Sequence, residues 1–178
     1  SIAKVDNLLA KVGAGHYGMG VLGAQWLAEA IGETGEVVIA AGPSGVTWAV
    51  ERVKGLKDTF AKDYPNIVVA AELNGPNGRD QGVTITEDWI QKFPDLKGIF
   101  AVVDDTGAGA ADSLAAAGKT DDVVVSTCNL SPIGKEYLLS GKIKCETIQQ
   151  IVLQGRITVQ VSDAYFKGES FEENHVTP

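Results

Sequence analysis

The sequence is poor in cysteine and histidine. Its 178 residues contain 2 Cys, Cys128 and Cys145, and 2 His, His16 and His175. A disulfide framework or a zinc site needs more of these residues at characteristic spacings. A chain of this length can also bury a sufficient core without either kind of cross-link. We therefore expect two free thiols and no bound metal or other cofactor.

Basic residues are also in the minority. Lys and Arg number 15 against 23 Asp and Glu, which gives a formal net charge of −8. Proteins bind the phosphate backbone of nucleic acids through clustered basic side chains. The charge balance therefore argues against nucleic acid as a partner.

Long hydrophobic runs are missing as well. The apolar runs are short ones, such as 37–41, 67–71 and 99–103. A membrane-spanning helix needs roughly 18 consecutive apolar residues or more. The sequence therefore predicts no transmembrane segment.

Short β-branched runs alternate with longer segments of helical period throughout the chain, and this order is typical of βαβ units. Strands are expected at 36–41, 67–73, 98–103, 122–127 and 142–149, with a shorter one at 11–14. Helices are expected at 17–31, from 46 to Pro65, and at 81–93, 106–117, 131–140 and 152–166. The runs are apolar on successive positions, as in a sheet that helices cover on both faces.

The predicted fold is a three-layer αβα sandwich with a mainly parallel six-stranded sheet. We expect residues 1–178 to form a single α/β ligand-binding lobe, with its compact core at about 8–168. No repeat or long linker interrupts the alternation. The two ends show little periodicity and look like severed connections.

In an open α/β sheet, a ligand sits beyond the carboxyl ends of the strands. The turn GPSGVTW at 42–48 follows the predicted strand at 36–41 and leads into a helix. It lacks the Lys of a phosphate loop and the third glycine of a dinucleotide motif. Trp48 could stack on a ligand, and Arg52 lies one helical turn later, so both side chains could face one opening. A core aromatic and a solvated arginine are the alternatives.

Asp104 and Asp105 follow the predicted strand at 98–103, which is the fourth along the chain. Such a pair could hold Mg²⁺ in a phosphate-accepting receiver domain, but the expected strand order is wrong for that class. One aspartate could instead cap the following helix while the other faces a ligand.

The remaining candidates are placed at strand ends by position alone: His16, Tyr17, Asn129, Gln149 and Gln150. Loop capping or simple surface exposure is the alternative for each of them. No Gly-x-Ser-x-Gly elbow is present, and nothing in the sequence supplies an activating base for Cys128. The set is suited to holding a polar solute rather than to transforming it, so we expect a protein that is not an enzyme.

These residues resemble the type I periplasmic binding proteins and the related effector domains of lactose-repressor-like regulators. The segment ERVKGLK at 51–57 is similar to the family's Arg-x-x-Gly-Phe helix. The family order continues with FPDLKGIFA at 93–101 followed by Asp104, and with GKI at 141–143 entering a strand that ends in Gln149 and Gln150. Sugar-binding members usually have Asn and Asp where this chain has Val103 and Cys128.

A narrower likeness, to the periplasmic sensor of the trimethylamine N-oxide reductase system, is carried by KVG at 11–13, YGMG at 17–20, the 42–48 turn and QIVLQGR at 150–156. The resemblance implies the carboxy-terminal lobe of a two-lobe protein, with inter-lobe crossings near 5–7 and 176–178 and the amino-terminal lobe missing. It implies a periplasmic protein that binds a small polar solute, sugar-like or amine-oxide-like, and presents it to a membrane importer or a sensor kinase. The alternative is the effector domain of a transcription regulator.

Overall fold

The computed structural model describes residues 8–178. Contacts within the chain divide these residues into two compact units. The larger unit is His16–Ile148, and the smaller one combines the residues up to Gly15 with Gln149–Pro178. In the described residues, no helix is both long and apolar enough to cross a membrane.

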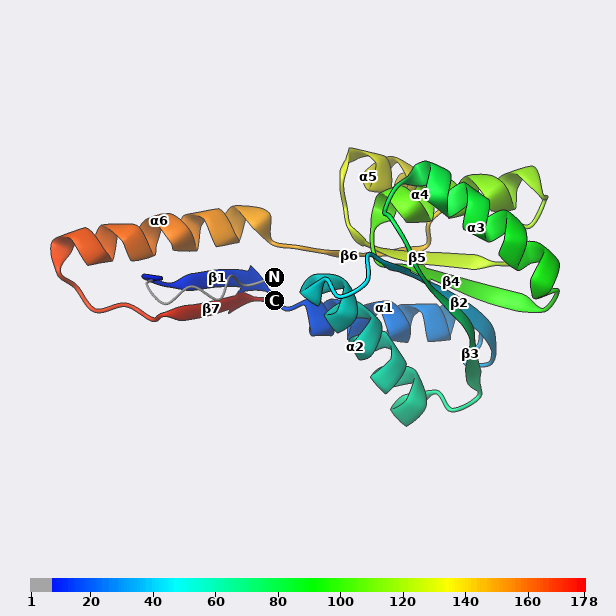
Figure 1. The fold of residues 1–178 in the computed structure, drawn as a ribbon, viewed down its shortest axis with the longest axis horizontal. Coiled ribbons are helices and arrows are strands. Elements are labelled where there is room, and N and C mark those ends of the chain that lie inside the picture. Colours follow the sequence, from blue (N-terminus) through cyan, green and yellow to red (C-terminus); the bar gives the residue numbers. More distant parts are fainter. Residues whose placement is uncertain (1–7) are drawn as a thin grey trace. The chain divides into compact units, whose positions relative to one another are not determined.

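The larger unit is built on a five-stranded parallel sheet with the order β3-β2-β4-β5-β6 (Figure 1). The strands are β2 (Gly35–Gly42), β3 (Ile67–Asn74), β4 (Leu96–Ala101), β5 (Val124–Asn129) and β6 (Cys145–Ile148). The chain passes from β2 to β3 on one side and then returns to place β4 on the other side of β2. This reversal creates a topological switch point between β2 and β4, where parallel α/β sheets commonly bind ligands.

Helices cover both faces of this sheet, as the apolar runs predict. One face carries α1 (His16–Ala30) and α2 (Thr47–Asp63), and the other carries α3 (Arg79–Lys92), α4 (Asp104–Ala116) and α5 (Pro132–Leu139), as Figure 1 shows. Successive residues of β2 enter different cores: Val37 and Ile39 pack with α1 and α2, whereas Val38 packs with α3 and α4. The three-layer α/β fold with a parallel sheet is thus confirmed.

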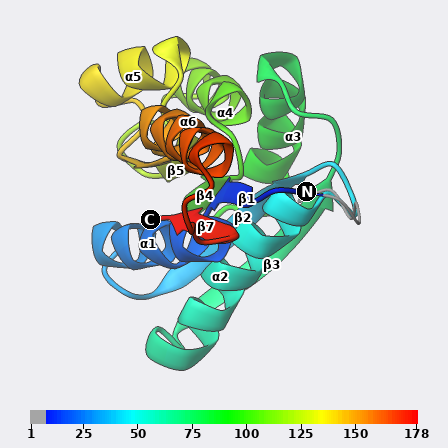
Figure 2. The ribbon, with the colours of Figure 1, turned by 90° about the vertical axis from the view of Figure 1, so that its left-hand side faces the viewer.

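The smaller unit pairs two strands from opposite ends of the sequence. Strands β1 (Lys11–Ala14) and β7 (Asn174–Thr177) lie side by side and parallel, next to α6 (Ile151–Lys167) (Figure 2). The Gln154 amide donates to Thr177 Oγ1 at 2.9 Å, and that hydroxyl donates to the Gly13 carbonyl at 3.2 Å. A single threonine therefore links the helix to both strands.

The prediction of a six-stranded sheet is wrong by one strand. Residues 11–14 do form the predicted strand, but it pairs with Asn174–Thr177 and not with the large sheet. The expected crossing at 176–178 falls within or just after β7, and the crossing near 5–7 lies outside the described residues. The expectation of a single ligand-binding lobe over 1–178 stays a prediction.

Glycines allow the helices to approach each other closely. A Cβ atom on Gly20 of α1 would collide with the Arg52 carbonyl oxygen, and one on Gly55 of α2 would collide with that of Tyr17. Gly82 and Gly109 meet the backbone in the same way between α3 and α4. Much of the glycine excess therefore serves two helix crossings, although Gly18 faces open space.

A polar network joins α3, α4 and α5 on the opposite face. Arg79 donates to Asp112 through Nε at 2.7 Å and to the Tyr137 hydroxyl at 2.8 Å, and that hydroxyl donates to Asp112 at 2.8 Å.

The two cysteines, Cys128 and Cys145, are buried and unpaired, which confirms the prediction of free thiols.

Candidate functional site

Arg52 is the charged group at the switch point. It projects from α2, which follows β2, and its Nη1 donates to the carbonyl oxygen of Val102, directly after β4, at 2.5 Å. Only 1% of Arg52 is exposed. Nη2 contacts the sulfur of Met19 at 3.7 Å, while Nε has no hydrogen-bond partner among residues 8–178.

The charge of Arg52 is only partly compensated. Burial lowers the pKa of the guanidinium, and the nearby Cys128 and Asp104 partly oppose that shift. Among the ion pairs of the described residues, none includes Arg52. A buried cation with an unused donor is unfavourable for folding alone, so this arrangement suits a group that completes its hydrogen bonds with a ligand.

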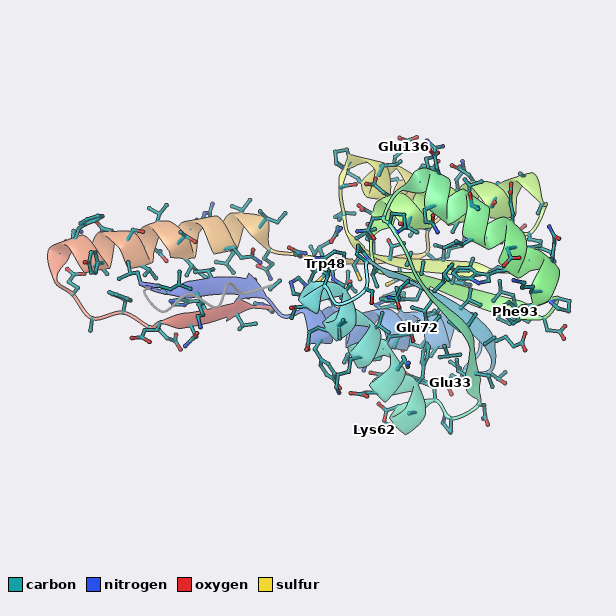
Figure 3. All side chains as sticks on the ribbon, viewed as in Figure 1. Glu33, Trp48, Lys62, Glu72, Phe93 and Glu136 are labelled. Carbon is teal, nitrogen blue, oxygen red and sulfur yellow. The ribbon has the colours of Figure 1, made fainter. Side chains whose placement is uncertain are left out.

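Trp48 accompanies this arginine. It lies in the first turn of α2, as Figure 3 shows, whereas Lys62 marks the far end of the helix. The Arg52 guanidinium carbon is 5.1 Å from the centre of the Trp48 ring, which is a cation–π distance. The ring is half-buried and packs against the core formed with α1 and α2. Trp48 and Arg52 are thus in contact, and their facing one ligand opening stays a prediction.

His16 and Tyr17 begin α1 but have different surroundings. His16 is half-buried, and its Nδ1 is buried without a hydrogen-bond partner in the described residues. Burial, followed by the charge of Arg52, lowers the pKa of His16 to about 4, so the ring is neutral at pH 7. Tyr17 is exposed, and its hydroxyl donates to Asp58 at 3.0 Å.

The two aspartates after β4 are separated by burial. Asp104 is 2% exposed, and its Oδ2 accepts from the Ser131 backbone N–H at 2.6 Å. Asp105 is exposed. The residue that caps α4 is Val103, with no side-chain hydrogen bond, so the idea that one aspartate occupies the cap position is wrong. Asp104 instead anchors the loop after β5.

The amide candidates divide between the two units. Asn129 ends β5 in the larger unit, is half-buried and has a φ of 118°. Gln149 and Gln150 belong to the smaller unit, where Gln150 precedes α6 and is exposed. In the larger unit, the structure thus brings Arg52, Trp48 and Asp104 to the carboxyl edge of the sheet.

Glu146 is a further group at this edge that the sequence reasoning missed. It lies on β6, and its Oε1 accepts from the Leu130 backbone N–H at 2.9 Å. Its Oε2 is buried and has no partner within hydrogen-bond geometry in the part of the chain that the structure describes. Burial raises the pKa of Glu146 to about 7; the Leu130 hydrogen bond opposes this shift, and the neighbouring Asp104 carboxyl adds to it. An acidic residue inside a strand covered by helices is a weak signal, because Glu36 on β2 and Glu72 on β3 share it and it does not single out Glu146.

A separate surface hollow of about 340 Å³ lies outside these groups. It is formed by α2, β3 and the turn after β2, and it contains none of the candidate residues named above. In the part of the chain that the structure describes, no cluster of His, Cys, Asp and Glu could hold a metal ion.

A family model described as a periplasmic binding protein domain matches residues 4–170. The chain belongs to the periplasmic binding protein family.

Named members of this family are similar over most of the chain. A xylitol-binding protein of Mycolicibacterium smegmatis is 32% identical over 85% of this chain and 43% of its own length. The ribose import binding protein RbsB of Salmonella typhimurium is 28% identical over 88% of this chain and 52% of its own. The chain therefore spans about half the length of these curated relatives.

A solved member of the family has the same fold. The periplasmic solute-binding protein of an ABC transporter from Actinobacillus succinogenes, with bound D-allose, has a TM-score of 0.90 and 28% identity, covering 95% of this chain and 60% of its own. The names of these three relatives all describe binding proteins. They favour a solute-binding protein over the effector domain of a transcription regulator.

The neutral state of His16 predicts an acid-sensitive contribution to the stability of this periplasmic binding protein. Between pH 6.5 and about 4, the unfolded chain binds a proton at His16 that the folded chain does not, so stability falls as the pH falls. We expect the free energy of unfolding of His16→Asn to fall less over this pH range than that of the wild type. The difference should be on the order of 1–2 kcal/mol, after allowance for the partial exposure of His16.

Urea unfolding at a series of pH values measures this difference. Glu146 contributes with the opposite sign between pH 4.5 and about 7, because it binds a proton more tightly when folded. Both proteins retain Glu146, so its contribution cancels in the comparison. Parallel pH profiles for the wild type and His16→Asn would contradict the prediction.

Proposed function

We propose that this chain is part of a periplasmic binding protein that holds a small neutral polar solute, a sugar or polyol, at the carboxyl edge of the five-stranded sheet. The observation that carries the proposal is the buried Arg52 at the switch point, with a free Nε donor and the Trp48 ring beside it. Sugar hydroxyls accept hydrogen bonds from a guanidinium, and the apolar face of a sugar ring packs on an indole. The names of the xylitol-binding and ribose import relatives support this ligand class.

The other candidates have supporting roles in this proposal. The neutral His16 and the amide of Asn129 would complete the hydrogen bonds of the solute, and Asp104 would orient the loop that carries Asn129. Asp105 and Tyr17 are exposed, and Gln149 and Gln150 remain predictions.

The family supports a proposal for the role in the cell. We propose a periplasmic location and delivery of the solute to a membrane importer or a sensor kinase. Because the chain spans about half the length of its curated relatives, we propose that an amino-terminal lobe supplies much of the burial that tight binding needs. The 178 residues alone should therefore bind weakly.

A compact amine oxide is the second candidate ligand. The positions where sugar binders usually have Asn and Asp hold Val103 and Cys128, which are 8% and 0% exposed. Fewer polar groups suit a solute with a single strong acceptor: Arg52 would donate to the oxide oxygen, and Trp48 would face the methylated cationic nitrogen.

Nuclear magnetic resonance of the 178-residue chain tests the proposal, since it detects weak binding at named residues. The probes are xylitol, ribose, allose, arabinose and trimethylamine N-oxide. The chain has 3 tryptophans, and hence three indole N–H signals. We expect the indole N–H signal of Trp48 to shift with one class of probe. The indole signals of the exposed Trp26 and the buried Trp89 should stay in place. Absence of any shift at Trp48 or around Arg52 with all probes would overturn the proposal.

Trp48→Ala should weaken the binding of the responsive probe by about 1–3 kcal/mol, or roughly fivefold to 150-fold, because it removes both the ring and its contact with Arg52. The dissociation constant from the same titration, followed on backbone amides, measures the effect. Trp26→Ala is the matched control, since Trp26 is a 58% exposed indole on α1. An equal loss in the two variants would contradict a specific role for Trp48.

A further inference from the structure

The turn after β5 has an unfavourable backbone. Asn129 and Leu130 are consecutive residues other than glycine with positive φ, 118° and 61°. Side chains disfavour this region, and such residues persist only when their surroundings hold them there. Ser131 follows as the cap of α5, with its Oγ accepting from the Gly134 N–H at 3.5 Å. Contacts with neighbouring elements must therefore hold Asn129 and Leu130 in this conformation.

Two carboxyl groups from different elements hold this turn. Glu146 on β6 accepts from the Leu130 N–H at 2.9 Å, and Asp104 at the start of α4 accepts from the Ser131 N–H at 2.6 Å. Consecutive backbone donors therefore each have a carboxyl acceptor. With one of the two carboxyls ionised, one of these hydrogen bonds is charge-assisted and the other is made to a neutral carboxyl oxygen, so the pair can maintain the strained conformation.

The same two carboxyl groups also lie close to each other. A Cβ atom on Gly134 would collide with an oxygen of each, so both face one small space beside α5. Asp104 is 2% exposed, and Glu146 Oε2 is buried, with the Thr127 hydroxyl and the Asp104 carboxyl as the side chains that interact with the Glu146 carboxyl. Two negative charges at this range repel strongly, which favours retention of one proton between them.

The other groups around Glu146 do not offset the effects that favour its protonated form. The hydroxyl of Thr127 on β5 lowers the pKa of Glu146, as does the Leu130 N–H, but burial and Asp104 outweigh them. The nearby thiols Cys128 and Cys145 have raised pKa values and stay neutral. Helices α1 and α5 also pack against β6. Their titratable side chains are His16, Tyr17, Glu29, Lys135, Glu136 and Tyr137.

We propose that Glu146 is a positioning residue: through one proton shared with Asp104, it holds the turn at 129–131 and makes the geometry of Asn129 depend on pH. When the proton is present, the two acceptors coexist and the turn is held. When it is lost, repulsion between the two carboxylates moves one of them away from its backbone donor. The effect on ligand affinity rests on the proposed function: a ligand that contacts Asn129 binds more weakly once the proton is lost.

The test follows the backbone amide signals of Leu130 and Ser131 in the 178-residue chain against pH, without any ligand. We expect both signals to move together with a midpoint near 7. In Glu146→Gln this titration should disappear, with both signals close to their low-pH positions, because the amide side chain permanently carries the protons. Glu136→Gln removes an exposed carboxyl from α5 and should leave the titration unchanged.

Gly134→Ala gives a second test that alters no charge. The added methyl group should force the two carboxyls apart and lower the midpoint towards the ordinary glutamate value of 4.5. A wild-type midpoint near 4.5, a near-neutral midpoint that survives in Glu146→Gln, or an unchanged midpoint in folded Gly134→Ala would each overturn the proposal. Since no ligand is used, these outcomes are independent of the proposed function.

Discussion

Replacement of Arg52 by methionine should nearly abolish solute binding while the protein stays folded. The guanidinium is 1% exposed, has no ion-pair partner among the described residues and leaves its Nε unused. Methionine fills a similar volume and removes the desolvation of a buried charge, but it leaves the Val102 carbonyl without its donor. These two effects oppose each other, so we expect the free energy of unfolding to change by less than about 2 kcal/mol.

In Arg52→Met, no second effect offsets the loss of solute affinity. Loss of charge-assisted hydrogen bonds to the solute should cost about 1.5–3 kcal/mol, which is roughly a tenfold to hundredfold rise in the dissociation constant. Titration of the responsive solute measures this, and urea unfolding of the same samples measures stability. The two measurements together separate a ligand contact from a structural arginine.

Arg79 provides a matched control on α3. Its side chain is 53% exposed and bonds to Asp112 and Tyr137. Arg79→Met should therefore lower stability by about 1 kcal/mol and leave solute affinity unchanged. If Arg52→Met instead lost several kcal/mol of stability and bound solute normally, Arg52 would be a structural residue and the proposed site would be wrong.

The larger unit was predictable because its signals are local. Most of its strands are short apolar runs followed by a helical period, with β6 as the exception, and parallel βαβ units leave few alternatives for the architecture. The place of residues 11–14 was not predictable in this way. The run looks like the first strand of a βα unit, but its partner is Asn174–Thr177 at the other end of the chain, and pairing across such a separation has no local signature.

The site shows the same division. The spacing of Trp48 and Arg52 is helical, so their contact could be predicted from sequence. The burial of Asp104 could not, because it depends on the Ser131 N–H after another strand. Glu146 was overlooked since its role arises from the loop geometry at 129–131 and from Gly134, which only the folded chain brings together.

Gly55→Ala should cause the largest loss of stability among these substitutions. A methyl group at this position of α2 would collide with the Tyr17 carbonyl oxygen of α1, and backbone cannot rotate away as a side chain can. The two helices would have to separate, which disrupts the core that they share with β2 and β4. Overpacking of this kind costs about 1–3 kcal/mol or more, and the better helix propensity of alanine returns up to about 1 kcal/mol.

We therefore expect a net loss of about 2 kcal/mol in the free energy of unfolding, measured by urea denaturation, and a fall in melting temperature of roughly 4–8 °C. Gly18→Ala is the control within the same helix pair. Gly18 lies in α1 and faces open space, so alanine there should leave stability unchanged or raise it by up to about 1 kcal/mol. Equal effects of the two substitutions would show that the crossing has room for a side chain.

The crossing also connects stability to the site. At its other contact, a methyl group on Gly20 would collide with the backbone carbonyl of Arg52 itself. Gly20→Ala should therefore destabilise the fold as Gly55→Ala does, and it should also displace the arginine from Val102 and weaken solute binding, because the guanidinium is held by its helix position and by the Val102 carbonyl. Normal binding by a destabilised Gly20→Ala protein would mean that the helix crossing does not set the position of the guanidinium.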